Sequence, residues 1–211
     1  VGAGCGKSSP ALLDSFGTHL DTLMTSKDKL SKMDGAAADL CVIENEDEFS
    51  ENDIEAPAGA LFNITDQKTL YSKNANDERE IASITKIMTA LLAMKYADLS
   101  QEVTISYTPE GLESSAVLCG FEQGDKMMLS SLLSAALIYS GNDAAIDIAI
   151  AVAGSQEAFV DMMNQESKEL MTSHTHFANP TGLTQSKHYS SVYDVYLMFQ
   201  ECLKYPTFRD I

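Results

Sequence analysis

A serine and a lysine three residues apart, Ser83 and Lys86, are the side chains in this sequence that are best spaced for acyl transfer. On a helix, residues i and i+3 lie on the same face, so the amine can reach the hydroxyl. A serine hydroxyl is a weak nucleophile at neutral pH and needs a nearby base. A lysine amine can be that base when burial lowers its pKa, and the apolar neighbours Ile81, Ile84 and Ile87 favour such burial.

The same spacing also has a purely structural interpretation. A helix that begins at Ser83 and extends a solvated Lys86 would show it without any chemistry. A second copy of the spacing, Ser26 to Lys29, lies in a charged segment that offers nothing to bury the lysine. We interpret that copy as a solvent-exposed face. The spacing therefore identifies a nucleophile only together with a second polar element.

Ser140, Gly141 and Asn142 form such an element, an S-x-N that lies between two apolar segments and 57 residues after Ser83. A loop that joins two buried helices can hold polar side chains rigidly against a cleft. There the Ser140 hydroxyl can relay a proton to a leaving amine, and the Asn142 amide can hold Lys86 or a substrate carbonyl. The alternative is that Ser140 and Asn142 only terminate and cap the two helices.

The elements that must position these residues follow from hydrophobic periodicity. Two short apolar runs around a polar turn predict a β-hairpin, and apolar residues at i, i+3, i+4 and i+7 predict helices. The expected strands cover 60–64, 69–72 and 103–106, and the expected helices cover 83–96, 129–137, 143–153, 156–171 and 191–204. Gly154 and Ser155 are expected to separate two helices, and Ser191 with Asp194 to begin the last one. Strands followed by a helical cluster, without regular βαβ alternation, predict an α+β fold.

The charge distribution divides the chain of 211 residues. Its net charge of −17 argues against nucleic acid as a partner, because phosphate backbones are bound by clustered lysine and arginine. Residues 1–55 hold 12 acidic and 4 basic residues, with an acidic run near their end that repels itself. We therefore interpret 1–55 as an N-terminal tether and acidic linker, in which the spacing of apolar residues over 10–33 is compatible with a short helix or with an extended stalk. Residues 56–211 are interpreted as one domain. No apolar run is long enough to span a bilayer.

The order of the two motifs gives the sequence a specific resemblance. An S-x-x-K that opens one apolar helix, followed by an S-x-N between two more, is a combination found in penicillin-binding proteins and serine β-lactamases. Together with further matching stretches, the chain over about 56–211 resembles the low-molecular-mass D-alanyl-D-alanine carboxypeptidases. These stretches read ASITKIMTALL (82–92), SGNDAA (140–145), AFVDMMN (158–164), THFANPTGL (175–183) and HYSSVYDVYLM (188–198).

The resemblance implies a fold, a reaction and a location. The fold would be that of DD-peptidases and serine β-lactamases, with a helical cluster on an antiparallel sheet. Ser83 would be the acyl-accepting nucleophile, Lys86 the general base, and Ser140 with Asn142 the second motif of the cleft. The substrate would be a peptidoglycan pentapeptide ending in D-Ala-D-Ala, from which the terminal D-Ala is released through an acyl-enzyme. β-Lactams would acylate the same serine, no cofactor is implied, and the protein would work in the bacterial cell envelope outside the cytoplasmic membrane.

One departure from the family pattern stands out. The family carries a third motif, K-T-G, on a later strand, whereas the only Lys-Thr pair here is Lys68 and Thr69, which is followed by Leu70 and precedes the first motif. We expect that the sequence is truncated before this strand, so that the fold is incomplete and the piece alone is inactive. Two other functions are considered. A serine β-lactamase shares the first two motifs, and a non-catalytic envelope protein could retain the fold without turnover.

Other candidate sites are less convincing. His174 and His176 lack a clustered carboxylate or cysteine at ligand spacing, so we expect a loop there and no metal. Cys5 follows small residues and precedes a polar run, as at the cleavage region of a bacterial lipoprotein, although Gly2 stands where a leucine is usual. This pattern suggests a lipid anchor at Cys5, which would be the protein's only membrane contact.

Overall fold

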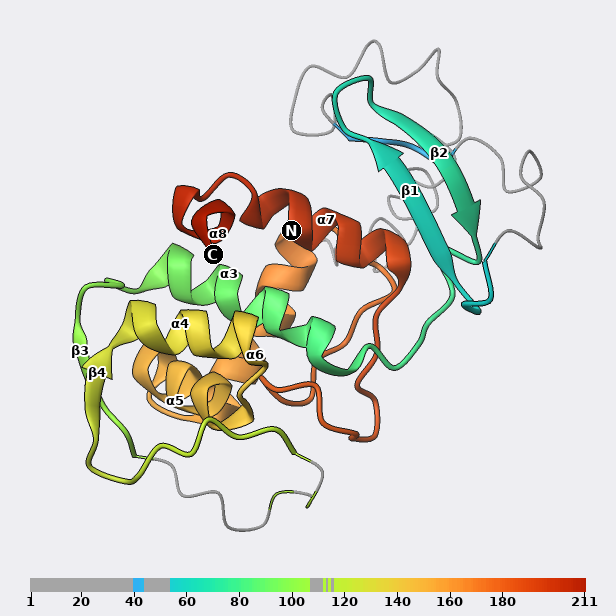
Figure 1. Cartoon of the computed structure of the whole chain (residues 1–211). Helices are drawn as coiled ribbons and strands as arrows, with labels where there is room; N and C mark the ends of the chain where they lie inside the picture. The colour runs from blue at the N-terminus through green and yellow to red at the C-terminus, as the bar shows by residue number, and fades with distance from the viewer. Residues whose placement is uncertain (1–39, 44–53, 107–111, 113, 115) are drawn as a thin grey trace, which may run out of the picture. The chain divides into compact units, whose positions relative to one another are not determined.

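The computed structural model describes residues 40–43, 54–106, 112, 114 and 116–211 (Figure 1). The chain divides into two compact units, Val1–Ala75 and Asn76–Ile211, and each is treated by itself below. The expected helix near 10–33 and most of the acidic linker lie outside the described residues. Within the described part of the chain, no helix is both long and apolar enough to cross a membrane.

The N-terminal unit contains a β-hairpin, as the sequence predicts. Strands β1 (Gly59–Asn63) and β2 (Lys68–Lys73) pair antiparallel with an irregularity in register after Leu61. The turn is stabilised by Asn63, whose side-chain oxygen accepts hydrogen bonds from the backbone N–H groups of Thr65 (3.1 Å) and Asp66 (3.0 Å). Asparagine favours such turns because its short side chain can hydrogen-bond to the backbone two residues further on.

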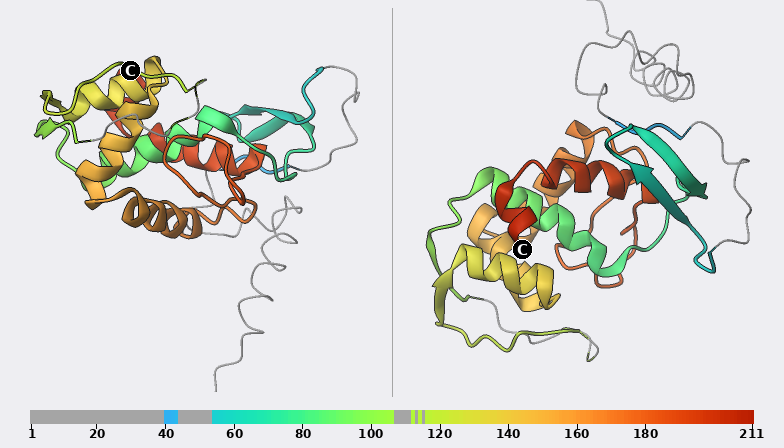
Figure 2. Two further views of the ribbon diagram at one scale, coloured as in Figure 1. Left: turned by 90° about the horizontal axis from the view of Figure 1, so that it is seen from below. Right: turned by 45° about the horizontal axis from the view of Figure 1, so that its top comes forward.

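The C-terminal unit is built around helix α3 (Lys86–Tyr96), which packs against four other helices (Figures 1 and 2). These are α4 (Leu129–Ile138), α5 (Asn142–Ala153), α6 (Gln156–Glu169) and α7 (Val192–Cys202), and a short α8 (Pro206–Asp210) follows. Six consecutive residues of α3, from Met88 to Ala93, are buried. A helix that is apolar on all sides belongs in the interior of a bundle, and α3 is therefore the central element.

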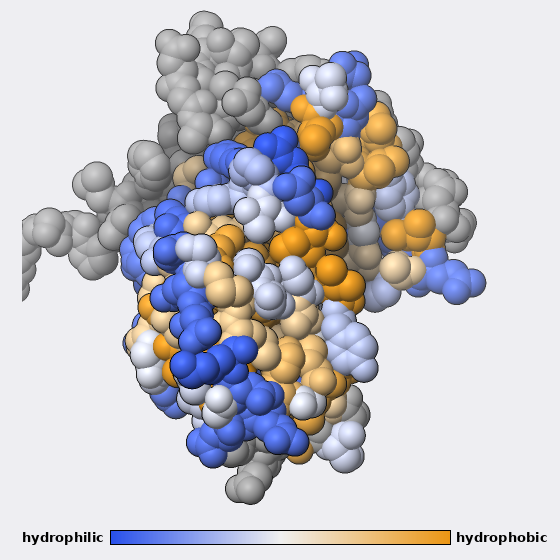
Figure 3. Space-filling model, turned by 60° about the vertical axis from the view of Figure 1, so that its left-hand side comes forward, coloured by the Kyte–Doolittle hydropathy of each residue, from blue (hydrophilic) through white to orange (hydrophobic). Residues whose placement is uncertain are grey.

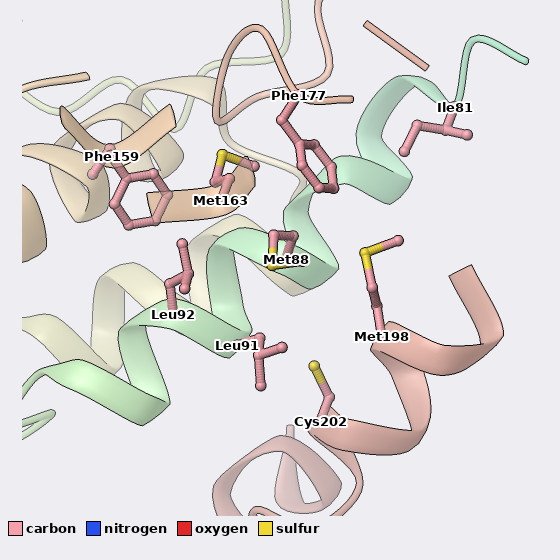
Figure 4. Close-up of a cluster of buried hydrophobic side chains, with 10 residues drawn as sticks. Ile81, Met88, Leu91, Leu92, Phe159, Met163, Phe177, Met198 and Cys202 are labelled. Atoms are coloured by element: carbon pink, nitrogen blue, oxygen red, sulfur yellow. The ribbon is translucent and has the colours of Figure 1, made fainter. Parts of the chain in front are cut away.

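Two hydrophobic clusters meet at α3. In the first, Met88, Leu91 and Leu92 of α3 point toward side chains of α6 and α7 and toward Phe177 (Figure 4). The second joins other residues of α3 to α4, α5 and Ile105, which is 1% exposed. Because α3 is packed on both sides, its first turn is held rigidly, and that turn begins with Lys86.

The helix boundaries agree with the predicted caps. Gly154 ends α5 in the left-handed conformation (φ 83°), and the Ser155 hydroxyl accepts a hydrogen bond from Ala158 N–H at the start of α6. The Ser191 hydroxyl accepts one from Asp194 N–H at the start of α7. Ser191 and Asp194 have the three-residue spacing of a capping box, in which the second side chain would bond back to the backbone N–H of the first, but the Asp194 carboxylate bonds elsewhere. It accepts hydrogen bonds from His174 N–H and the Thr175 hydroxyl, both at 2.7 Å.

A second small sheet, which the sequence only half predicts, precedes α4. Strand β3 (Glu102–Thr104) pairs antiparallel with β4 (Lys126–Met128). The second strand escapes prediction because three residues are too few to show an alternating pattern. The described chain is thus α+β, with helices and two small antiparallel sheets.

Its surface mixes hydrophilic and apolar residues (Figure 3). The exposed apolar side chains include Ile84, Ile138 and Tyr139.

Candidate active site

Ser83 lies in a tight turn immediately before the central helix. A 3₁₀ turn, η2 (Ala82–Thr85), leads directly into α3, and Ile84 N–H donates to Ile81 C=O at 3.1 Å. Ala82 has a positive φ of 46°, a conformation that is costly for a residue with a side chain and that clusters at functional sites. The turn leaves Ser83 exposed while it buries Thr85 and Lys86. The Ser83 hydroxyl is thereby presented to solvent beside a buried amine.

The Lys86 amine is surrounded by oxygen atoms from three parts of the chain. Its Nζ lies 3.1 Å from Ser83 Oγ, 2.9 Å from Asn142 Oδ1 and 2.9 Å from the carbonyl oxygen of Thr181, with Ser140 Oγ at 3.4 Å. All four residues that the sequence singled out therefore meet at one nitrogen. An ammonium can donate three hydrogen bonds, whereas the neutral amine donates two and keeps a lone pair that can accept a proton from a hydroxyl.

Burial decides the protonation of this amine. Lys86 is 2% exposed, and removal from water lowers its pKa to about 8, although the Asp143 carboxylate and the Cys119 thiol act in the opposite direction. With a pKa of about 8, about a tenth of the molecules carry the neutral amine at pH 7. An unperturbed lysine would be almost entirely protonated there. Lys86 is thus suited to accept a proton near neutral pH.

The Ser140–Asn142 motif connects two helices, as predicted. Helix α4 ends at Ile138 and α5 begins at Asn142, and Ser140 between them has a φ of 61°. A side chain at Gly141 would overlap the sulfur of Cys119, so the motif lies closely against that segment. The two interpretations of the motif do not exclude each other, because Asn142 both opens α5 and accepts a hydrogen bond from Lys86.

Asp143 attaches the preceding segment to this motif. Its carboxylate accepts hydrogen bonds from the backbone N–H groups of Cys119 (3.0 Å) and Gly120 (2.9 Å), and Asn142 N–H donates to Val117 C=O at 2.9 Å. Asp143 is 4% exposed, so these donors replace the water that a buried carboxylate loses. Sequence reasoning assigned Asp143 no role. Its position directly after Asn142 of the second motif was the available signal.

A loop at 178–183 supplies the part of the site that the sequence could not assign. The Asn179 side-chain oxygen accepts from the N–H groups of Thr181 (3.1 Å) and Gly182 (2.7 Å), which turns the Thr181 carbonyl toward Lys86. Pro180 C=O accepts from the Thr89 hydroxyl of α3 at 2.7 Å. Asn-Pro and Thr-Gly are turn-forming pairs, so the turn was recognisable. A backbone carbonyl, however, has no residue type that a motif search can detect.

His174 and His176, which the sequence predicts to lie in a loop, make hydrogen bonds to neighbouring segments. His176 Nδ1 lies 2.6 Å from Lys187 C=O, and His174 N–H donates to Asp194. Among the described residues, no group of three or more His, Cys, Asp or Glu side chains is arranged to hold a metal ion.

Solved structures define the class of fold. A mutant DD-transpeptidase from Streptomyces superposes with a TM-score of 0.70 at 29% identity and covers 74% of this chain and 64% of that one. Penicillin binding protein 6B from Escherichia coli gives a TM-score of 0.67 at 27% identity, over 76% of this chain and 55% of that one. The fold is therefore that of the penicillin-binding DD-peptidases.

The family follows from the sequence comparisons. A profile of the D-alanyl-D-alanine carboxypeptidases matches residues 45–210. The D-alanyl-D-alanine carboxypeptidase DacF of Bacillus subtilis is 41% identical over 156 residues, which are 72% of this chain. A D-alanyl-D-alanine endopeptidase of Escherichia coli is 31% identical over 138 residues. The chain belongs to the D-alanyl-D-alanine carboxypeptidase family, and it spans about 40% of the length of the curated carboxypeptidases that it matches.

Proposed function

We propose that this protein is a serine D-Ala-D-Ala carboxypeptidase that acts on peptidoglycan stem peptides. Ser83 Oγ attacks the carbonyl carbon of the penultimate D-Ala, the bond to the terminal D-Ala breaks, and D-alanine leaves. Water then hydrolyses the Ser83 ester and releases the shortened peptide. The observation that carries the proposal is the position of the buried Lys86 amine, which lies 3.1 Å from Ser83 Oγ.

The proton transfers follow from the same contacts. The neutral amine of Lys86 takes the Ser83 proton as the new C–O bond forms, while Asn142 Oδ1 and the Thr181 carbonyl hold the amine in place. The leaving nitrogen must gain a proton, and Ser140 Oγ, which is 3.4 Å from Lys86 Nζ, is placed to pass it on. Ser140 and Asn142 therefore serve both proton transfer and substrate binding in this proposal.

A class A β-lactamase deacylates with a glutamate that follows the second motif in an E-x-x-x-N arrangement, and none of Glu157, Glu166 and Glu169 has an asparagine four residues later. Glu166 is also engaged elsewhere, because its buried carboxylate pairs with the partly exposed Lys95 at 2.8 Å and accepts from Tyr96 OH at 3.1 Å. Lys95 is nine residues after Lys86, which is roughly 13 Å along the helix. Glu166 therefore acts as a structural partner of Lys95. This arrangement favours the carboxypeptidase over the β-lactamase.

The proposed activity implies partners and a location. The substrate is a peptidoglycan pentapeptide ending in D-Ala-D-Ala, β-lactam antibiotics acylate Ser83 as inhibitors, and no nucleic acid is involved. The site of action is the bacterial cell envelope, outside the cytoplasmic membrane. Within the chain, we propose that residues 1–55 are a tether with a lipid anchor at Cys5, and that 56–211 form part of the DD-peptidase domain.

The test is D-alanine release from a synthetic peptide ending in D-Ala-D-Ala, measured with the protein at its full natural length. Ser83→Ala should abolish release. Ser26→Ala, which removes the serine of the second S-x-x-K, is the matched control and should leave the rate unchanged. Undiminished release by Ser83→Ala would refute the assignment of the nucleophile. A cross-linked peptide dimer in a parallel assay distinguishes a carboxypeptidase from an endopeptidase, since only the latter cleaves the cross-link.

A further inference from the structure

A buried histidine contacts the turn that carries Ser83 and Lys86. His188 is 5% exposed, and its Nε2 lies 2.7 Å from Oγ1 of Thr85, a residue 103 positions earlier in the chain. On the other side of the ring, Nδ1 accepts a hydrogen bond from the backbone N–H of Ala178 at 3.0 Å. Both ring nitrogens are therefore engaged, one by the loop and one by the turn.

These two contacts determine the protonation of the ring. A backbone N–H can only donate, so Nδ1 facing Ala178 must carry a lone pair and no proton. A neutral imidazole with an unprotonated Nδ1 has its proton on Nε2, and His188 therefore donates to the Thr85 hydroxyl. Phe177 packs edge-on against the ring, with the centroids 5.9 Å apart, and fixes its plane.

Thr85 is the residue through which this contact can reach the site. Thr85 is fully buried, it belongs to η2, and it lies between Ser83 and Lys86 in sequence. Gly182 approaches the same turn so closely that a Cβ there would overlap the carbonyl of Ala82 and approach the Thr85 hydroxyl. The Thr85 hydroxyl joins the turn to His188 by a directional hydrogen bond, and Ala178 N–H joins His188 to the loop at 178–183.

We propose that His188 is a positioning residue of the active site: its neutral ring, oriented by Ala178, donates from Nε2 to Thr85 and fixes the turn that aligns Ser83 with Lys86. This inference rests on the proposed function, because alignment matters only if Ser83 is the nucleophile. A displacement of about 1 Å between reacting groups can reduce a rate by about 100-fold.

Protonation of His188 would break this arrangement. A second N–H on Nδ1 would face the Ala178 N–H, so two donors would oppose each other. Burial and the nearby His176 both lower the pKa of His188 and favour the neutral ring. The titratable residues that line the open cavity beside His188 are of both signs: Glu78, Arg79, Glu80, Lys187 and Tyr189. Acylation should therefore need two deprotonations, that of Lys86 and, in more acidic solution, that of His188.

The experiment measures the rate of acylation by a fluorescent penicillin between pH 4.5 and 9, using the protein at its full natural length. His188→Asn keeps an acceptor for Ala178 but is too short to reach Thr85, and Thr85→Val removes the hydroxyl at constant shape. Each should slow acylation by about 10- to 100-fold, and the double variant should be no slower than either alone. Thr85→Ser, which retains the hydroxyl, should be acylated at nearly the wild-type rate.

The pH profile provides a readout that a merely structural role would not change. In the wild type, the slope of log rate against pH should steepen from about 1 to about 2 in acid, because two groups must lose protons. His188→Gln places an amide donor near Thr85 that does not titrate, so the slope should stay near 1. The control His174→Gln changes a histidine that contacts Asp194 through its backbone N–H, and it should keep the wild-type profile.

Three outcomes would overturn the inference. The first is a wild-type acylation rate and pH profile in His188→Asn. The second is a loss of rate in His188→Asn that is fully explained by the fraction of this variant that a thermal melt shows to be unfolded. The third is a ¹⁵N NMR spectrum of the Ser83→Ala protein in which Nδ1 of His188 is protonated. The last measurement does not depend on activity. If the wild-type protein is not acylated at all, the proposed function fails as well. If Ser83 is acylated but His188→Asn is unaffected, only this inference fails.

Discussion

Burial and charge act in opposite directions on the Lys86 amine. Burial favours the neutral form, whereas the Asp143 carboxylate favours the ammonium, and burial prevails because the pKa falls to about 8. The Asp143 oxygens accept hydrogen bonds from the N–H groups of Cys119, Gly120 and Ala144, which compensate the buried carboxylate for the water that it has lost. The balance leaves a lysine that can function as a base near neutral pH.

Removal of this amine should abolish most of the activity. Lys86→Met keeps a long apolar side chain in the buried position but has no proton acceptor, and a general base contributes typically 10²–10⁴-fold to a rate. We expect acylation by penicillin to slow by about that factor. Near-ultraviolet circular dichroism should show the native fold. A native fold with a wild-type acylation rate would exclude Lys86 as the base.

The acylation rate should also depend on pH in a defined direction. Because the ammonium form of Lys86 cannot accept a proton and the pKa is about 8, the rate should rise about tenfold per pH unit below 8 and level off above it. Stopped-flow acylation between pH 6.5 and 9.5 measures this profile. A rate that does not change over this range would contradict the assignment.

Gly182 offers a test of the close approach between the loop and the turn. Its φ of 87° disfavours any side chain, and a Cβ would also overlap Ala82. Gly182→Ala should lower the free energy of unfolding by about 1–3 kcal/mol and also slow acylation. Gly154→Ala is the control, since it has a similar φ of 83° but no atom within 4 Å of the added Cβ. This control should lose stability in chemical denaturation and keep its acylation rate.

At the scale of elements, helix α3 carries Lys86 and is packed from both sides. Met88, Leu91 and Leu92 pack α3 against α6 and α7 (Figure 4). Ala90 and Ala93 belong to the second cluster, which includes residues of α4 and α5. The helix therefore cannot shift without opening two clusters. This packing is the reason that Lys86, at the first position of α3, is held in a single place relative to Asn142 at the first position of α5.

The cap of α6 should contribute to stability without affecting chemistry. The Ser155 hydroxyl accepts from Ala158 N–H at 3.1 Å, and loss of such a cap typically costs about 1 kcal/mol. Ser155→Ala should lower the melting temperature by about 2–4 °C and leave acylation unchanged. Ser131→Ala, on the exposed surface of α4, is the control and should change stability by a few tenths of a kcal/mol. An equal loss in both variants would show that the cap contributes nothing.

Sequence periodicity predicted these elements well because each pattern is local. The buried face of α3 and the caps at Gly154, Ser155 and Ser191 are determined by neighbouring residues. Sequence periodicity did not predict the contacts that join distant segments of the chain. The Thr181 carbonyl reaches Lys86 across 95 residues and His188 reaches Thr85 across 103, and neither the distance nor a carbonyl leaves a sequence pattern.

At the scale of the whole molecule, the densest acidic run and the candidate active site belong to different segments, although residues 56–211 also carry a net negative charge. The oxygen atoms around Lys86 all come from the C-terminal unit, whereas the dense acidic run belongs to residues 1–55. The net charge of −17 is therefore not a property of the active site alone. The described fold contains two short sheets and a helical bundle, and Ser83 and Lys86 lie where the central helix of that bundle begins.

Lipidation of Cys5 in the proposed tether can be tested separately. If Cys5 is a lipid anchor, the protein at its full natural length should incorporate radiolabelled palmitate in its bacterial host and partition with membranes. Cys5→Ala should lose both properties. Cys202→Ala is the control, because that thiol is buried, and it should keep the label. Failure of the wild type to incorporate palmitate would reject the anchor without affecting the proposed reaction.

The central claim is that Ser83 is the acyl-accepting nucleophile, and the most direct measurement locates the adduct. The protein at its full natural length is treated with a penicillin, digested and sequenced by tandem mass spectrometry. We predict one added acyl group on the peptide that contains Ser83, and none on the peptide that contains Ser26. An adduct on any other residue, or undiminished acylation in Ser83→Ala, would contradict the account.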